Sequence, residues 1–128
     1  MSGPRRLLVD GMNVIGSRPT GWWRDRPGAI RDLVESLTAY ASESGDQVSV
    51  VFDGKPMDVV AGPVEVMFAS RAGPDAADDE IVKRVAADPD PDGLTVITSD
   101  SRLAQRVREH GAEVVGAGGF RRELDERR

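Results

Sequence analysis

Apolar residues form two alternating kinds of pattern along the chain. Short runs rich in apolar residues at 6–9, 48–52, 64–69, 94–98 and 112–115 are typical of strands, and the run at 48–52 is of the kind found where both faces of a strand are covered. Between these runs, apolar residues recur every three or four positions from Pro27, over 76–87 and over 100–110, as they do in amphipathic helices. The pattern therefore predicts strands that alternate with helices.

Turn-forming residues separate these elements. Residues 10–13, Asp-Gly-Met-Asn, are predicted to turn after the first strand, and 16–27 are predicted to form a loop. Pro27 suits the first turn of a helix, and Gly45 is predicted to end that helix. Further loops are expected at 70–74 and 88–93, and the charged tail 121–128 is expected to be a solvated helix or a frayed end.

The same alternation predicts the fold class. Strand–helix–strand units connect through right-handed crossovers, so the sheet should be mostly parallel, with helices on both faces. A length of 128 residues suits a single α/β domain over 1–128, and we see no internal repeat or linker. In such folds, ligands bind beyond the carboxyl ends of the strands.

Acidic residues occupy those strand ends. Asp10, Asp53 and Asp100 each follow a predicted strand, and Asp78 and Asp79 lie in the first turn of the helix predicted at 76–87. Taken singly, each acid has a structural explanation as a turn residue, a helix cap or a partner of a helix dipole. Together at one edge they would repel one another by roughly 1–4 kcal/mol per pair at 4 Å, and a bound cation removes that repulsion.

Composition narrows the chemistry that these residues can perform. The chain has no cysteine, which excludes disulfides, thiolate zinc sites and cysteine nucleophiles, and its one histidine, His110, precedes Gly111 at a predicted helix end. Carboxylates must then carry the chemistry, and such hard oxygen ligands favour Mg²⁺ or Mn²⁺. Asn13 could orient a carboxylate or a nucleophilic water, whereas the hydroxyls of Thr98 and Ser99 could bind phosphate or cap a helix.

Charge and aromatic residues indicate where a polyanion could bind. The net charge of -5 argues against non-specific wrapping of nucleic acid. Only two of the 17 basic residues are lysines; arginine suits bidentate phosphate contacts, although a composition bias explains the same count. In the loop at 16–27, either the indoles stack on bases, contributing ~1–3 kcal/mol per base, or one packs over the next helix and the other stays half exposed. The side chains expected to contact a nucleic acid are Arg18, Trp22, Trp23, Arg24 and Arg26.

The sequence also predicts the compartment. No apolar run approaches the ~20 residues that a membrane helix requires. The first residues lack a basic stretch followed by an apolar core, so no signal peptide is expected. Because a chain without cysteine needs no oxidising compartment, we expect a cytoplasmic protein with no membrane partner.

Three motifs resemble, in their order and spacing, the signatures of the NYN domain, a branch of the PIN-like ribonucleases, and most closely its YacP-like bacterial group. They are Asp-Gly-Met-Asn-Val-Ile at 10–15, Ala-Asp-Asp-Glu-Ile at 77–81 and Thr-Ser-Asp at 98–100. The match runs from Leu7 to about Phe120. The resemblance implies a PIN-like three-layer α/β/α sandwich, dependence on a divalent metal, and RNA as the substrate.

The resemblance also implies roles for individual residues. It implies a catalytic group of Asp10, Asn13, Asp78 and Asp100, and metal ligands at Asp10, Asp78, Asp79 and Asp100. Asp53 is expected at the rim of the site together with Thr98 and Ser99. Ala76 departs from the YacP-like pattern, which often has threonine before Ala-Asp, so one small polar contact is expected to be missing.

We therefore interpret the chain as an endoribonuclease, a hydrolase of RNA phosphodiesters that uses Mg²⁺ or Mn²⁺. An alternative stays open: a non-catalytic RNA-binding or ribosome-associated module of the same fold, in which the acids serve structure. Metal-dependent cleavage separates the two. A haloacid-dehalogenase-like phosphatase is disfavoured because Met12 stands where a second acid would follow Asp10, and a receiver domain because no lysine follows Lys83.

Overall fold

The computed structural model describes residues 4–69 and 75–127. Within these residues the strands are β1 (Arg6–Asp10), β2 (Gln47–Asp53), β3 (Glu65–Ala69), β4 (Leu94–Ile97) and β5 (Glu113–Val115). The helices are α1 (Gly11–Ile15), α2 (Arg26–Ser44), α3 (Ala76–Ala87), α4 (Ser101–Arg108) and α5 (Ala117–Glu126), with short 3₁₀ turns η1 (Trp22–Arg24) and η2 (Pro91–Gly93). The loop predicted at 70–74 lies outside the described residues.

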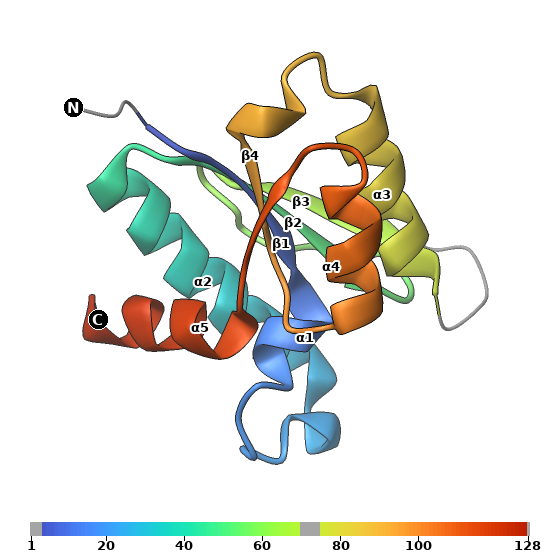
Figure 1. Ribbon diagram of the computed structural model, residues 1–128. Helices are drawn as coiled ribbons and strands as arrows, with labels where there is room; N and C mark the ends of the chain where they lie inside the picture. Colours follow the sequence, from blue (N-terminus) through green and yellow to red (C-terminus); the bar gives the residue numbers. More distant parts are fainter. Residues whose placement is uncertain (1–3, 70–74, 128) are drawn as a thin grey trace.

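All strand pairs in the sheet are parallel, in the order β3-β2-β1-β4-β5 (Figure 1). β1 is central, with Leu7 paired to Val48 of β2 and to Thr95 of β4. Because the strands run the same way, their carboxyl ends meet at one edge, and α1, α3 and α4 begin there. The fold predicted from the alternation, a parallel sheet in an α/β domain, is confirmed.

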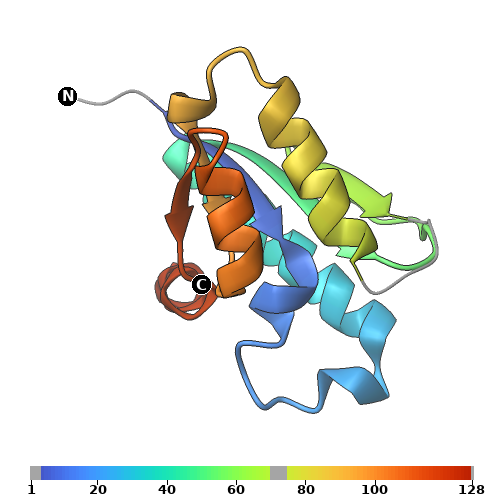
Figure 2. The ribbon, with the colours of Figure 1, turned by 45° about the vertical axis from the view of Figure 1, so that its right-hand side comes forward.

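Helices cover both faces of this sheet. α1, α2 and α5 pack on the face that includes Leu7 and Val9, whereas α3 and α4 pack on the face that includes Leu8 (Figures 1 and 2). Successive residues of a strand point to opposite faces, so a strand buried on both faces must be apolar throughout. The continuous apolar runs in the sequence reflect this three-layer arrangement.

The limits of the long helices follow the local signals in the sequence. Pro27 lies in the first turn of α2, and the Asp25 side chain caps that helix by accepting the Gly28 N–H at 3.1 Å. Gly45 ends α2 with a φ of 77°, a conformation that favours glycine. α3 spans the predicted Ala76–Ala87, and within the described residues no helix has both the length and the apolar character needed to cross a bilayer.

Two segments differ from the prediction. Residues 11–15 form the helix α1 and not a turn, because Gly11 lets the chain approach β2: a Cβ there would lie 2.4 Å from the Phe52 ring. α5 begins at Ala117 and buries Phe120 and Leu124 in the core, so its charged residues belong to a packed helix. The tail 121–128 was predicted to be a solvated helix or a frayed end; its described part is helical as far as Glu126, but Leu124 is buried in the core, so one side of the helix is packed and not solvated.

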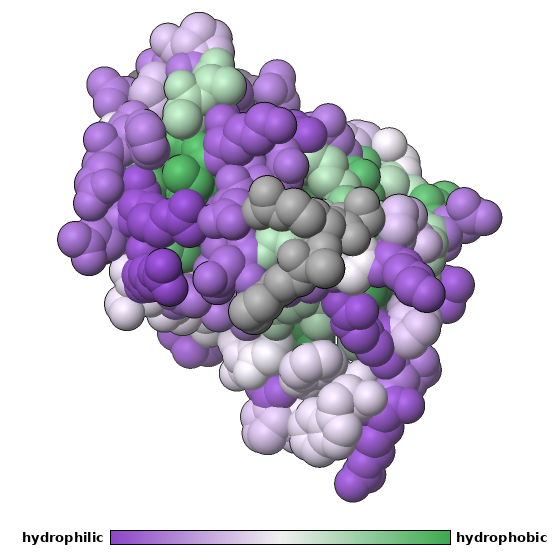
Figure 3. All heavy atoms as spheres, turned by 90° about the vertical axis from the view of Figure 1, so that its right-hand side faces the viewer, coloured by the Kyte–Doolittle hydropathy of each residue, from purple (hydrophilic) through white to green (hydrophobic). Residues whose placement is uncertain are grey.

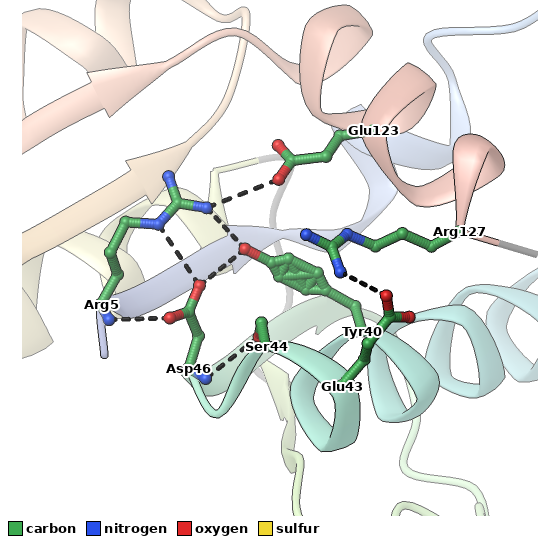
Figure 4. Close-up of polar contacts among 7 residues, drawn as sticks. All are labelled: Arg5, Tyr40, Glu43, Ser44, Asp46, Glu123 and Arg127. Atoms are coloured by element: carbon green, nitrogen blue, oxygen red, sulfur yellow. Dashed lines mark hydrogen bonds and ion pairs between the residues drawn. The ribbon is translucent and has the colours of Figure 1, made fainter. Parts of the chain in front are cut away.

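A polar network fastens α5 and α2 at the opposite, amino edge of the sheet (Figure 4). The Tyr40 hydroxyl donates to Asp46 Oδ2 at 2.6 Å and accepts from Arg5 Nη2 at 2.5 Å. Arg127, near the end of α5, lies over the Tyr40 ring at 4.9 Å from its centroid. Three elements distant in sequence thus meet around one buried phenol.

Candidate active site at the carboxyl edge of the sheet

Asp10 ends the central strand and is the most enclosed acid of the candidate site. Its residue is 6% exposed, and Thr98 Oγ1 donates a hydrogen bond to Asp10 Oδ2 at 2.9 Å. The pKa of Asp10 is raised to about 6, mainly by burial and also by the negative charges of Asp78 and Asp53, while hydrogen bonds from Thr98 and the Asn13 backbone oppose the shift. Asp10 is thus a carboxyl group for which ionisation is costly.

Asp78 and Asp53 face Asp10 from α3 and the end of β2. The pKa of Asp78 is raised to about 6, mainly by burial and next by the negative charges of Asp100, Asp75 and Asp53. Asp53 Oδ1 accepts the Ala77 N–H at 3.1 Å, which ties the first turn of α3 to the end of β2. The sequence placed Asp53 at the rim, but its charge acts on both Asp10 and Asp78.

Asp100 serves as the N-cap of α4 at the same edge. Its Oδ1 accepts the backbone N–H groups of Arg102 at 2.9 Å and Leu103 at 3.0 Å. Its charge also raises the pKa of Asp78. Both capping bonds use Oδ1, so Asp100 can cap α4 and still offer Oδ2 to the candidate site.

Asn13, Thr98 and Ser99 link the elements around these acids. Thr98 is 1% exposed, donates to Asp10 and accepts the Asp100 N–H at 3.1 Å, so it fixes the orientation of Asp10. The Ser99 N–H donates to Asn13 Oδ1 at 2.8 Å, and Ser99 Oγ accepts the Ala117 N–H at 2.8 Å. Ser99 therefore caps α5, a helix that the sequence did not predict to begin there.

Asp79 forms an ion pair with Arg106 of α4. Its Oδ1 lies 3.1 Å from Arg106 Nη2, which joins α3 to α4. Arg106 also lowers the pKa of Asp78, against the larger upward effects. This arginine was not identified from the sequence, although its place between Leu103 and Val107 at helical spacing puts it beside the apolar face of α4.

Comparison with known proteins identifies the family. The sequence profile of the YacP-like NYN domain matches residues 7–128. The chain belongs to the YacP-like NYN family. This NYN domain is 39% identical over 95 residues to a "UPF0178 protein" of Halorhodospira halophila, covering 74% of this chain and 57% of that protein. It is 36% identical over 105 residues to one of Xanthomonas oryzae pv. oryzae, covering 80% and 60%.

Solved structures of a relative share the fold of this NYN domain. Rae1 (YacP) from Bacillus subtilis is 29% identical with a TM-score of 0.79, over 94% of this chain and 74% of that one. Its W164L mutant gives a TM-score of 0.78, over 96% and 76%. The chain spans about three fifths of the length of the curated relatives that it matches.

The donor set of this NYN domain suits a hard divalent cation. Within 4–69 and 75–127, no group of three acidic or histidine side chains is already spaced as a coordination shell. Mg²⁺, however, keeps several water ligands and needs only one or two carboxylates directly. The raised pKa values of Asp10 and Asp78 reflect burial together with mutual repulsion, and a cation relieves the second of these.

The loop that the sequence assigned to RNA divides into buried and exposed parts. Trp22 packs against the core, whereas Trp23 is 62% exposed with Arg24 over its ring at 5.9 Å. Arg18 pairs with Asp125 of α5, and Arg26 donates to the main-chain oxygen of Asp53. The two indoles meet edge to face at 6.2 Å. Of the five expected RNA contacts, Trp23 and Arg24 are the exposed ones.

The surface around the site is polar. Figure 3 looks onto the side of the molecule that carries α3 and α4, and hydrophilic residues dominate this face. Within α3, Glu80 and Arg84 pair across one turn at 3.2 Å.

Proposed function

We propose that this NYN domain is an endoribonuclease that depends on Mg²⁺ or Mn²⁺. The observation that carries the proposal is the group of Asp10, Asp53, Asp78 and Asp100 at the carboxyl edge of the sheet, in which burial and mutual repulsion raise two pKa values to about 6. Repulsion among these carboxylates lowers the stability of the folded protein, and strongly shifted pKa values of this kind are concentrated at functional sites. Ligand sites in open parallel sheets lie at this edge.

The proposed roles follow from the contacts of each side chain. A bound divalent cation would neutralise phosphate charge and lower the pKa of a water molecule. Asp10, Asp78 and Asp100 would hold the cation, with Asp79 as a further ligand reached by exchanging its contact with Arg106. Asn13 would orient the attacking water with the amide nitrogen that its bond to Ser99 leaves available, and Thr98 would keep Asp10 in place.

RNA is the proposed partner because the family relationship and the motifs support it together. The relatives that this chain matches are longer, so the RNA recognised by the whole protein, and any association with the ribosome, are part of the proposal. A non-catalytic RNA-binding module is the outcome that the experiment must separate. In that case the acids would affect folding but not RNA processing.

The test is cleavage of mixed cellular RNA by the purified chain with and without Mg²⁺ or Mn²⁺. Asp10→Asn, Asp78→Asn and Asp100→Asn keep side-chain shape but remove charge, so each should slow cleavage by about 10²-fold or more, or ~2.7 kcal/mol. Asp32→Asn, an exposed residue of α2, is the matched control and should cleave like the parent.

Melting temperature and RNA affinity are measured on the same variants. Affinity without metal should hold steady or rise slightly, because less negative charge faces the polyanion. If folded Asp variants cut as fast as the parent, these residues do not form the site. A parent that binds RNA but never cuts it is a binding module.

A further inference from the structure

A hollow of about 430 Å³ lies beside the acids, between α1 and the first turn of α5. Met12, Asn13, Gly16, Ser17, Ser99 and Gly118 line it. Two of these residues connect it to the site: Asn13 through its backbone bond to Asp10, and Ser99 as the neighbour of Thr98. None of the clustered acids lines this hollow itself, nor a larger one of about 770 Å³ that is lined by α2 and residues 58–62.

The walls of the smaller hollow present polar atoms with free bonding capacity. The Ser99 N–H can donate only to an oxygen, so its contact with Asn13 fixes Oδ1 on that side and leaves the two N–H groups of Nδ2, which bond to no described residue. Ser99 Oγ accepts from Ala117 and keeps its own proton, while Ser17 Oγ donates to the Val14 carbonyl and can still accept. Donors and an acceptor thus line the same space.

The remaining walls suit a flat ring. Gly16 and Gly118 contribute no side chain, and the Met12 thioether is a polarisable group that makes favourable contacts with aromatic rings. The volume falls in the range of small-ligand sites, which is roughly 300–1,000 Å³. Unpaired RNA bases are recognised in this way, by stacking together with hydrogen bonds to their edges.

The fold itself does not require glycine at 118. Gly118 lies within α5, where glycine is less favourable than alanine by about 1 kcal/mol. It is not among the glycines with positive φ, and a Cβ added there would meet no atom within 4 Å. Because Gly118 lines the hollow, we expect a large side chain at this position to reduce its volume.

We propose that this hollow binds one unstacked nucleobase of the RNA, next to the scissile phosphate, and so sets the base preference of cleavage. The inference rests on the proposed function in placing the base next to the phosphate that is cut, but the binding of the base itself does not depend on cleavage. Asn13 Nδ2 carries two N–H groups, so one would donate to the base edge while the other orients the water. Ser99 Oγ would also donate to the base edge, and Met12 would pack on the ring.

The test compares Gly118→Leu with Gly119→Leu. Both replace glycine in the same turn of α5, but position 119 does not line the hollow, and a Cβ there meets only Arg122 Nη2 at 3.8 Å. Heptaribonucleotides of A, U or C are titrated in EDTA, where a metal-dependent nuclease cannot cut, and amide chemical shifts are followed. We expect shifts at Gly16, Ser17 and Gly118, with affinity about tenfold weaker in Gly118→Leu and unchanged in Gly119→Leu.

The cleavage arm then uses an RNA library with Mg²⁺ or Mn²⁺. The parent and Gly119→Leu should share a base preference at one position flanking the cut, and Gly118→Leu should lose it. Equal binding by the folded Gly118→Leu variant, or shifts that spare these amides, overturns the proposal even if RNA is cut. If RNA is bound as expected but never cut, the nuclease proposal fails while the base site stands.

Discussion

At the scale of single residues, the buried acids make opposite demands on stability and on metal binding. Asp10 has a pKa of about 6, against 3.8 for an unperturbed group, so the folded state holds a proton that the unfolded state has already lost between these values. Stability from this proton is fully present below about pH 4 and is lost as the pH rises through about 6. A bound cation would reverse this preference by favouring the ionised carboxylate.

We therefore predict that the metal-free protein is more stable near pH 4.5 than at pH 7. The whole shift on this buried carboxyl corresponds to at most about 3 kcal/mol, of which the interval from pH 4.5 to pH 7 covers at most about 2 kcal/mol. Urea unfolding in EDTA measures the difference, and Asp10→Asn, which mimics the protonated acid, should reduce it. Asp46 and Asp88 have lowered pKa values, so the stability that their ionised forms contribute is lost only at pH values below the interval from 4.5 to 7.

The result is decided by comparison with Asp32→Asn, whose exposed side chain should leave the parental pH profile intact. Equal pH profiles for the parent and Asp10→Asn would show that Asp10 does not hold a raised pKa in the folded protein.

At the scale of elements, the loop at 16–27 joins packed and exposed side chains. The structure separates them, since Trp22 contacts the core and Trp23 does not. We predict that Trp23→Ala with Arg24→Ala lowers RNA affinity by about tenfold, as expected from the loss of one stacked base. The melting temperature should stay close to that of the parent, because exposed loop residues contribute little to the core.

Fluorescence anisotropy of labelled RNA at low and high salt measures this affinity, and the difference should shrink in high salt. Arg31→Ala, exposed on α2, controls for the loss of one positive charge. Replacing Trp22, Trp23, Arg24 and Arg26 together should also weaken RNA binding. That variant should in addition be less stable, because it loses the packing of Trp22 and the hydrogen bond of Arg26. Unchanged affinity at low salt would make the loop structural.

The network around Tyr40 holds the far end of α5. Its phenol is 1% exposed, burial together with the hydrogen bond to Asp46 raises its pKa, and the pKa of Asp46 is lowered by its hydrogen bonds although burial opposes this. Tyr40→Phe leaves Asp46 and Arg5 each without one partner. We predict a loss of about 1–3 kcal/mol in the free energy of unfolding.

Denaturant unfolding checks the value, with Arg127→Ala as a comparison that removes only the stacked cation and should cost less than about 1 kcal/mol. If Tyr40→Phe is as stable as the parent, the network adds nothing beyond the packing of the ring.

These elements also show which parts of the fold and of the site could be predicted from the sequence. α3 was predicted with its limits because its periodicity and flanking residues act locally. By contrast, α1 packs on β2, and α5 packs on α1 and α2, so both depend on contacts with elements elsewhere in the chain. The gathering of Asp10, Asp53, Asp78 and Asp100 followed from parallel topology. The capping of α5 by Ser99 and the ion pair between Asp79 and Arg106 did not, since they require the relative placement of elements far apart in sequence.

At the scale of the whole molecule, the carboxyl edge of the sheet carries the clustered acids of the proposed site, and the amino edge carries the polar network that holds α5 against α2. The acids lie where the parallel strands end, and the Tyr40 network closes the other edge (Figures 1 and 4). α5 spans both, from the Ser99 cap to Arg127 over Tyr40. The contacts at the amino edge therefore help to offset the destabilising repulsion among the acids at the carboxyl edge.

This arrangement predicts that Mg²⁺ or Mn²⁺ raises the melting temperature. A cation that binds only the folded state adds ~2.7 kcal/mol at 100 times its dissociation constant. The gain should be larger at pH 7 than at pH 5, because below a pKa of about 6 the ion must displace protons from Asp10 and Asp78. Calorimetry over a range of ion concentrations at both pH values gives the measurement.

The acid variants show whether the effect arises at this site. Asp78→Asn should abolish most of the gain, whereas Asp32→Asn should retain it, since both remove one charge but only the first lies in the cluster. Asp78→Asn should also be more stable than the parent in EDTA, because it removes the repulsion that the cation otherwise offsets. A parent protein that melts at the same temperature with and without millimolar Mg²⁺ and Mn²⁺ has no cation site among these carboxylates.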